Sequence, residues 1–170
     1  MKKIFLQPIS ARGQSLVEFA ISLLILLYLI SGAAEFGILF FQYIQLRDAA
    51  QEGALYGSLH PSDTAGMITR IQNSSDKPLD LKSAAVTIEI YIDDNPNDTS
   101  DGIPYTDATN YPKKACEGHG LKVIAQYDHK IFMPFIPKLI RTDKIRLRAV
   151  VTDTILTPAP TASAPLGSCK

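Results

Sequence analysis

The sequence predicts an α+β fold in which a long amino-terminal helix continues into a small antiparallel β-sheet domain. Two observations carry this prediction. Residues 14–58 contain no proline, and the first half of this segment is almost entirely apolar. After Pro61, three segments alternate apolar and polar side chains with a period of two, which is typical of half-buried strands.

The apolar run is long enough to cross a membrane. Every residue from Phe19 to Ala34 is apolar or small, and the 26 residues from 19 to 44 would form a helix of about 39 Å. The hydrocarbon core of a bilayer is only about 30 Å thick, and the apolar core of a cleaved secretory signal is shorter than this run. Lys2, Lys3 and Arg12 precede the run, so we expect a cytoplasmic amino terminus and an extracytoplasmic carboxy-terminal part.

The helix is expected to continue beyond the membrane to residue 58. Small and apolar residues recur there at steps of four and three along one stripe: Leu39, Tyr43, Leu46, Ala50, Gly53 and Gly57. His60-Pro61 ends the pattern, because a residue before proline avoids helical geometry. Ala50, Gly53 and Gly57 permit the close approach of another backbone. That backbone belongs to another subunit, to the chain's own outer domain, or to both.

Residues 59–156 are expected to form one extracytoplasmic α+β domain. Ser62-Asp63-Thr64 predicts the cap of a short helix that ends near Asn73. Strands are predicted at residues 86–92, 121–127 and 145–151, and an antiparallel meander packed on the helix stripe is the simplest arrangement. Residues 157–170, which are rich in Pro, Ala, Ser and Thr, are expected to form a flexible tail.

Two long connections join the predicted strands. The acidic turn at residues 93–98 lacks the glycine and glutamate that a calcium loop of the EF-hand type requires. The second connection contains the apolar loop Phe132–Pro137, flanked by Lys130, Lys138 and Arg141. We expect this loop to cover the core, and contact with a membrane surface or a neighbouring subunit is the alternative.

Composition argues against several functional classes. Lys+Arg and Asp+Glu both number 17, so the chain lacks the basic excess of a nucleic-acid-binding protein. The two cysteines, Cys116 and Cys169, lack the spacing of a zinc site, and no metal or cofactor site is expected. They form a disulfide in an oxidising compartment or remain two free thiols. No catalytic motif is present, so a membrane-tethered hydrolase is a weaker hypothesis than a non-enzymatic protein.

The most informative motif lies just before the apolar run. Gly13 follows Arg12, and Glu18 is the fifth residue after that glycine, beside Phe19. An ionised carboxylate that enters hydrocarbon costs several kcal/mol unless it finds a partner. The spacing indicates a processing and assembly signal. The simpler explanations are a helix-start glycine at Gly13 and interfacial carboxylates at Glu18 and, near the opposite interface, Glu35.

The segment from Gly13 to Glu18 resembles the cleavage motif of type IV prepilins, in which a membrane-embedded peptidase cuts after the glycine. Residues 12–57 closely resemble the TadE-like pseudopilins of tight-adherence (Flp-type) pilus systems. Three stretches carry this resemblance: residues 13–19, Glu35-Phe36-Gly37 and residues 47–54. The chain departs from the family pattern in two places. Many relatives have a proline where this chain has Ser22-Leu23-Leu24, and a basic residue where it has Leu55.

The resemblance implies a pilin-like fold and a minor subunit for assembly of a tight-adherence pilus. Residues 1–13 would then be a leader peptide, removed by a prepilin peptidase to leave Gln14 first, and the mature helix would cover residues 14–58. The implied partners are the prepilin peptidase, other pilin and pseudopilin subunits, the inner-membrane assembly platform and the lipid bilayer. The implied location is the bacterial inner membrane, with the pilus as a further destination.

The resemblance also implies a role for Glu18, and one alternative function stays open. In a filament, the carboxylate of Glu18 would pair with the new amino group of Gln14 in a neighbouring subunit, a contact that sets orientation more than stability. The alternative function is an uncleaved single-pass anchor that presents an extracytoplasmic binding domain.

Overall fold

The predicted α+β class is confirmed by a computed structural model, which describes residues 13–75, 77–93, 102–133 and 136–157. The helices are α1 (Gln14–Leu59), α2 (Thr64–Asn73), α3 (Tyr111–Lys114) and α4 (Ile136–Ile140). The strands are β1 (Val86–Asp93), β2 (Ile103–Pro104), β3 (Gly120–Lys130) and β4 (Lys144–Thr154). Most of the expected leader, most of the acidic turn and all of the expected tail after Thr157 lie outside the described residues.

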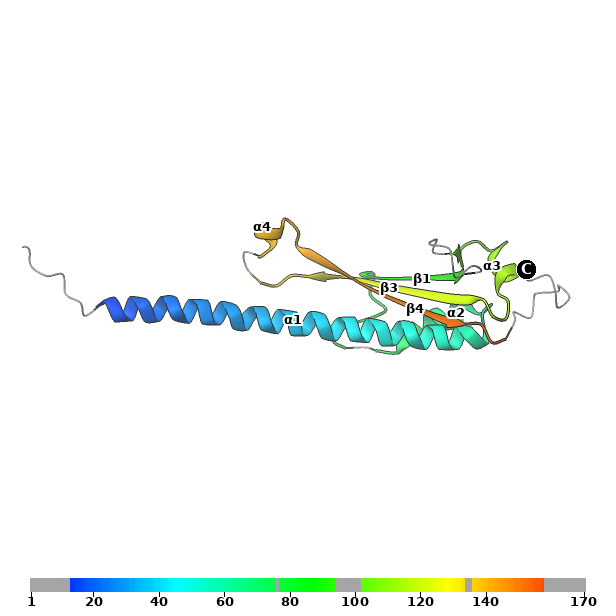
Figure 1. The fold of residues 1–170 in the computed structure, drawn as a ribbon, viewed down its shortest axis with the longest axis horizontal. Helices are drawn as coiled ribbons and strands as arrows, with labels where there is room; N and C mark the ends of the chain where they lie inside the picture. The colour runs from blue at the N-terminus through cyan, green and yellow to red at the C-terminus, as the bar shows by residue number, and fades with distance from the viewer. Residues whose placement is uncertain (1–12, 76, 94–101, 134–135, 158–170) are drawn as a thin grey trace, which may run out of the picture.

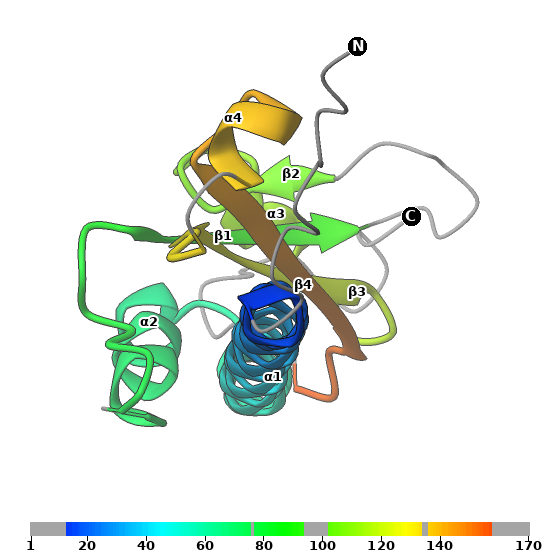
Figure 2. The ribbon, with the colours of Figure 1, turned by 90° about the vertical axis from the view of Figure 1, so that its left-hand side faces the viewer.

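The four strands form one antiparallel sheet in the order β2-β1-β3-β4. Its three long strands confirm the predicted meander. In the centre, Val123 of β3 lies opposite Ile90 of β1 and Val151 of β4. Since side chains alternate along a strand, these three residues share the face of the sheet that meets α1. Figure 2 shows α1 lying along this face, with α2 beside it.

Three short elements were not predicted from the sequence. They are β2, α3 and α4, which have 2, 4 and 5 residues. Such lengths are too short for a recognisable period of 2.0 or 3.6 residues. The long helix ends at Leu59, one residue after its predicted end, and α2 begins at the predicted cap, where the backbone N–H of Gly66 donates to Asp63 at 2.9 Å.

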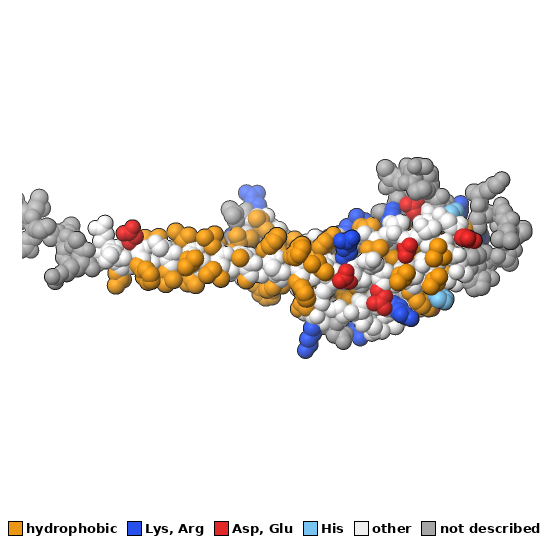
Figure 3. Space-filling view, turned by 60° about the horizontal axis from the view of Figure 1, so that its bottom comes forward, with side chains coloured by type: hydrophobic (Ala, Val, Ile, Leu, Met, Phe, Trp, Pro, Cys, Tyr) orange, Lys and Arg blue, Asp and Glu red, His pale blue; other side chains and the backbone are white. Residues whose placement is uncertain are grey.

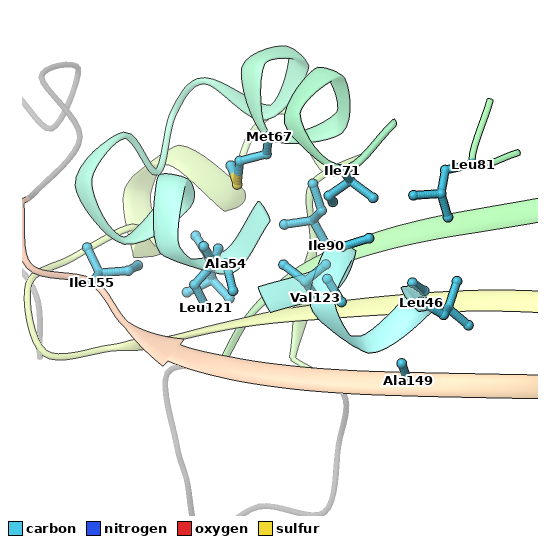
Figure 4. Close-up of a cluster of buried hydrophobic side chains, with 14 of the residues drawn as sticks. Leu46, Ala54, Met67, Ile71, Leu81, Ile90, Leu121, Val123, Ala149 and Ile155 are labelled. Carbon is cyan, nitrogen blue, oxygen red and sulfur yellow. The ribbon is translucent and has the colours of Figure 1, made fainter. Parts of the chain in front are cut away.

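The hydrophobic core lies where the second half of α1 meets α2 and the sheet (Figure 4). It contains fully buried side chains from each of these elements, among them Leu46, Met67, Ile71, Ile90, Leu121 and Val123. Burial on α1 begins at Gln42. The first half of the helix therefore projects beyond the domain, as Figure 1 shows.

The apolar loop Phe132–Pro137 was expected to cover the core. That expectation is wrong for the residues of the loop that the structure describes. The β3–β4 hairpin extends past the core along α1, so that α4 is level with the middle of the long helix but set off from it (Figure 1). Met133 packs there: a methyl group built on Gly32 would lie 3.6 Å from its terminal carbon. Phe132 is 74% exposed, and Pro134 and Phe135 lie outside the described residues.

Candidate processing and assembly site

Gly13 is the residue immediately before α1. Its φ of −99° is accessible to any residue, and a Cβ built on it would meet no atom within 4 Å. Neither the backbone conformation nor packing within the described chain requires glycine here. A requirement for glycine at this position would therefore come from another molecule, such as a peptidase whose pocket excludes a side chain.

Glu18 lies one helical turn after Gln14 on an exposed part of α1. Its neighbours Leu16 and Phe19 are also exposed. Among the residues that the structure describes, none forms an ion pair or a hydrogen bond with the Glu18 carboxylate. Residues four apart lie on the same side of a helix, so cleavage after Gly13 would create an amino group on the same face as this carboxylate. The structure does not bring Glu18 near Glu35 or the small-residue stripe.

The first half of α1 is long and apolar enough to span a membrane. The helix has 46 residues, and its most apolar 18-residue window has a mean hydropathy of 2.2 and is not buried by the rest of the chain. Figure 3 shows hydrophobic side chains covering the projecting part of the helix. An apolar helix surface of this extent is suited to lipid tails and not to water.

Glu35 joins a polar cluster between α1 and the end of β3. Its Oε1 atom lies 3.1 Å from Nε2 of His129 and accepts the backbone N–H of Phe132 at 3.0 Å. The other ring nitrogen of His129, Nδ1, lies 2.7 Å from Oε1 of Gln42. The cluster ties the end of the hairpin to α1 with groups that satisfy one another.

Sequence reasoning placed Glu35 near an interface but missed His129. Two signals could have found the pair. Glu35 and Gln42 are seven residues apart, and therefore share one face of a helix. His129 continues the inward-facing series of β3, in which alternate residues from Leu121 to Tyr127 face the helix. A histidine at the end of such a series needs a polar partner on the element that the strand packs against.

The small-residue stripe packs on the chain's own domain. Ala50, Gly53 and Gly57 are buried. A Cβ on Gly53 would overlap Ile71 of α2, and one on Gly57 would overlap Met67 and Leu121. The structure therefore gives these residues the intrachain role that was one of the two expectations, and contact with another subunit at this stripe stays a prediction.

Cys116 is buried. Cys169, its expected partner, lies outside the described residues, so the Cys116–Cys169 pairing stays a prediction. Within the described part of the chain, no group of three or more His, Cys, Asp or Glu side chains could hold a metal ion.

Comparison with known proteins finds a family match for the first part of the chain. The family model described as TadE-like protein matches residues 13–55, about a quarter of the sequence. No curated protein and no solved structure matches the chain. The match begins at Gly13, includes Glu18 and covers the apolar helix. The resemblance expected from the sequence is therefore confirmed over residues 13–55, which match the TadE-like model and contain the helix segment that is long and apolar enough to span a membrane.

Proposed function

We propose that this protein is a minor pilin-like subunit of a tight-adherence pilus, cleaved by a prepilin peptidase after Gly13 and held in the inner membrane before assembly. The observation that carries the proposal is the TadE-like match that begins at Gly13 and contains Glu18. An exposed glycine with no packing role, followed by an apolar helix that projects from its domain, supports the same function.

Intact mass of the membrane-extracted protein tests the cleavage. Expressed with a prepilin peptidase, the chain should lose Met1 to Gly13 and leave 170 − 13 = 157 residues that begin with Gln14. Without the peptidase it should keep its full mass. A full-length product in the presence of an active peptidase, shown to be active on another prepilin, would contradict the proposal and favour the uncleaved anchor.

A pair of glycine variants on α1 tests whether cleavage depends on Gly13 in particular. Gly13→Ala should block cleavage, because the added methyl would enter the pocket of the peptidase. Gly37→Ala is the control, since a Cβ there also meets no atom within 4 Å and the residue lies on the same helix. The two changes differ in their effect on the helix, because alanine is favoured over glycine inside a helix, as at Gly37, and glycine over alanine at the N-cap, as at Gly13. Equal cleavage of the two variants would contradict a role for Gly13 in recognition.

We further propose that Glu18 acts in assembly after cleavage. Its carboxylate, which is unpaired within the described chain, would bind the amino group of Gln14 in a neighbouring subunit. Glu18→Gln should leave cleavage intact and lower the amount of subunit in a sheared pilus fraction. Asp48→Asn, an exposed carboxylate change on the same helix, is the control. Normal incorporation of the Glu18→Gln protein would rule out this pairing.

A further inference from the structure

The tip of the β3–β4 hairpin (residues 130–133 and 136–144) lies at the level of the apolar half of α1. The backbone N–H of Phe132 donates to Glu35, and Met133 packs at Gly32. The tip is therefore fixed beside a part of the helix that is otherwise bare. Figure 1 shows α4 at the level of this middle portion of α1, set off from the helix.

The position of Glu35 along the helix sets the depth of the tip. Glu18 and Glu35 are 17 residues apart, or about 26 Å along the helix axis. The hydrocarbon core is about 30 Å thick. If Glu18 marks one edge of the hydrocarbon core, Glu35 lies just inside the opposite edge. The hairpin tip, bonded to Glu35, then lies at the boundary between acyl chains and headgroups and not in bulk water.

The side chains of the tip suit that boundary. One face, with Ile131 and Met133, is buried, whereas Phe132 and Ile140 are 74% and 46% exposed. The exposed charged residues of the tip are Lys130, Lys138, Arg141, Asp143 and Lys144, four basic and one acidic. Figure 3 shows Lys or Arg side chains above hydrophobic ones beside the middle of the helix. Apolar side chains next to basic ones are typical of segments that lie in the interface of an anionic membrane.

The backbone at the end of α4 adds a second indication. Arg141 has a φ of +58°, in the left-handed region that favours glycine. Arg141 is exposed and places a positive charge at the end of α4.

We propose that the hairpin tip is a second membrane contact of this protein. Phe132 and Ile140 enter the acyl boundary of the leaflet on the domain's side, and the basic residues around them bind anionic headgroups. This contact fixes the height and rotation of the domain relative to the bilayer, with the Glu35–His129 pair as the link to α1. The inference rests on the membrane span of α1, and it does not depend on cleavage after Gly13.

The absence of tryptophan from the chain makes a direct test available. Phe132→Trp would be the only tryptophan in the full chain, reconstituted in vesicles of equal parts phosphatidylcholine and phosphatidylglycerol. Its fluorescence should be quenched by lipids brominated near the headgroup, and its acrylamide quenching should be several-fold weaker than that of the control Leu156→Trp. Leu156 is also exposed, at 61%, but lies after β4 at the other end of the sheet. Ile140→Trp repeats the measurement on α4.

A tryptophan in the middle of the span distinguishes failure of the tip contact from failure of the membrane span itself. Leu29→Trp should be quenched most by lipids brominated deep in the acyl chain. If it is and Phe132→Trp remains as accessible to acrylamide as Leu156→Trp, the tip contact is wrong and the span stands. If Phe132→Trp is shielded from acrylamide but not quenched by brominated lipid, protein covers the tip and the proposal is overturned. If Leu29→Trp is not quenched by lipid, the span and the proposal both fail, whatever the state of residue 13.

The contribution of charge has its own matched control. In the Phe132→Trp protein, the double change Lys138→Gln and Arg141→Gln should raise acrylamide quenching in the anionic vesicles. Arg47→Gln with Lys77→Gln removes the same charge at exposed positions away from the tip and should leave quenching unchanged. Equal effects of the two double changes would overturn headgroup binding at the tip.

Discussion

The two halves of α1 have the same secondary structure but opposite surroundings. From Gln14 to Phe41 the helix is almost bare, and its apolar side chains face outward. From Gln42 to Leu59 one face of the helix is buried against α2 and the sheet, and the other face is exposed. One continuous helix thus serves as an anchor and as the central element of a domain. Residues of the same type therefore have different roles in the two halves, and paired substitutions can separate those roles.

The largest difference in stability is expected when one leucine in each half is replaced by alanine. Leu46 has no exposed surface, whereas Leu29 is 67% exposed. Leu46→Ala should lower the free energy of unfolding of the domain by about 2–5 kcal/mol, because it leaves a cavity between α1 and the sheet. Leu29→Ala should leave it unchanged. Urea unfolding in detergent, followed by the near-ultraviolet signal of the 7 tyrosines, measures both. Equal losses would mean that the two halves do not differ in packing.

An intermediate effect is expected from the two glutamates of the projecting half. Glu35→Ala should cost about 1–3 kcal/mol, because a ring nitrogen of the buried His129 and the Phe132 N–H lose their acceptor. Glu35→Gln, which keeps an acceptor oxygen, should cost less. Glu18→Ala should have no effect on the same unfolding curve, as its carboxylate has no partner in the described chain. A comparable loss from Glu18→Ala would show that the anchor half contributes to domain stability.

The smallest effect is expected for the pH dependence of stability that comes from Asp63, which follows α1. The Gly66 N–H, and next the Tyr56 hydroxyl, donate to Asp63 and lower the pKa of its carboxyl. A carboxyl whose pKa is lower in the folded state contributes stability above its unfolded pKa of about 3.9. That contribution is lost as the pH falls through the folded pKa.

Asn is also a good helix cap but does not titrate, so Asp63→Asn provides the control. Melting temperatures measured from neutral to strongly acidic pH should fall slightly less in the Asp63→Asn protein than in the parent. Identical pH profiles would assign the acid sensitivity of the domain to other carboxylates.

Much of this architecture follows from local patterns in the sequence. The uninterrupted run from Gln14, the period of two in the three long strands and the cap at Asp63 each depend on near neighbours along the chain, and all three predictions are confirmed. The motif from Gly13 to Glu18 is likewise local, and the family match includes it. Short elements such as α4 gave no comparable signal, because 5 residues do not complete two turns.

The way in which these elements meet could not be predicted from local patterns and is seen in the fold. The sequence determined that a stripe of small residues exists on α1, and the fold determined that Gly53 and Gly57 receive side chains from the same chain. It also brought His129 to Glu35, 94 positions away, and carried the hairpin tip past the core to the apolar half of the helix. Helix and strand periods are set by the backbone of neighbouring residues, whereas these contacts depend on the angle and offset at which a whole sheet packs on a helix.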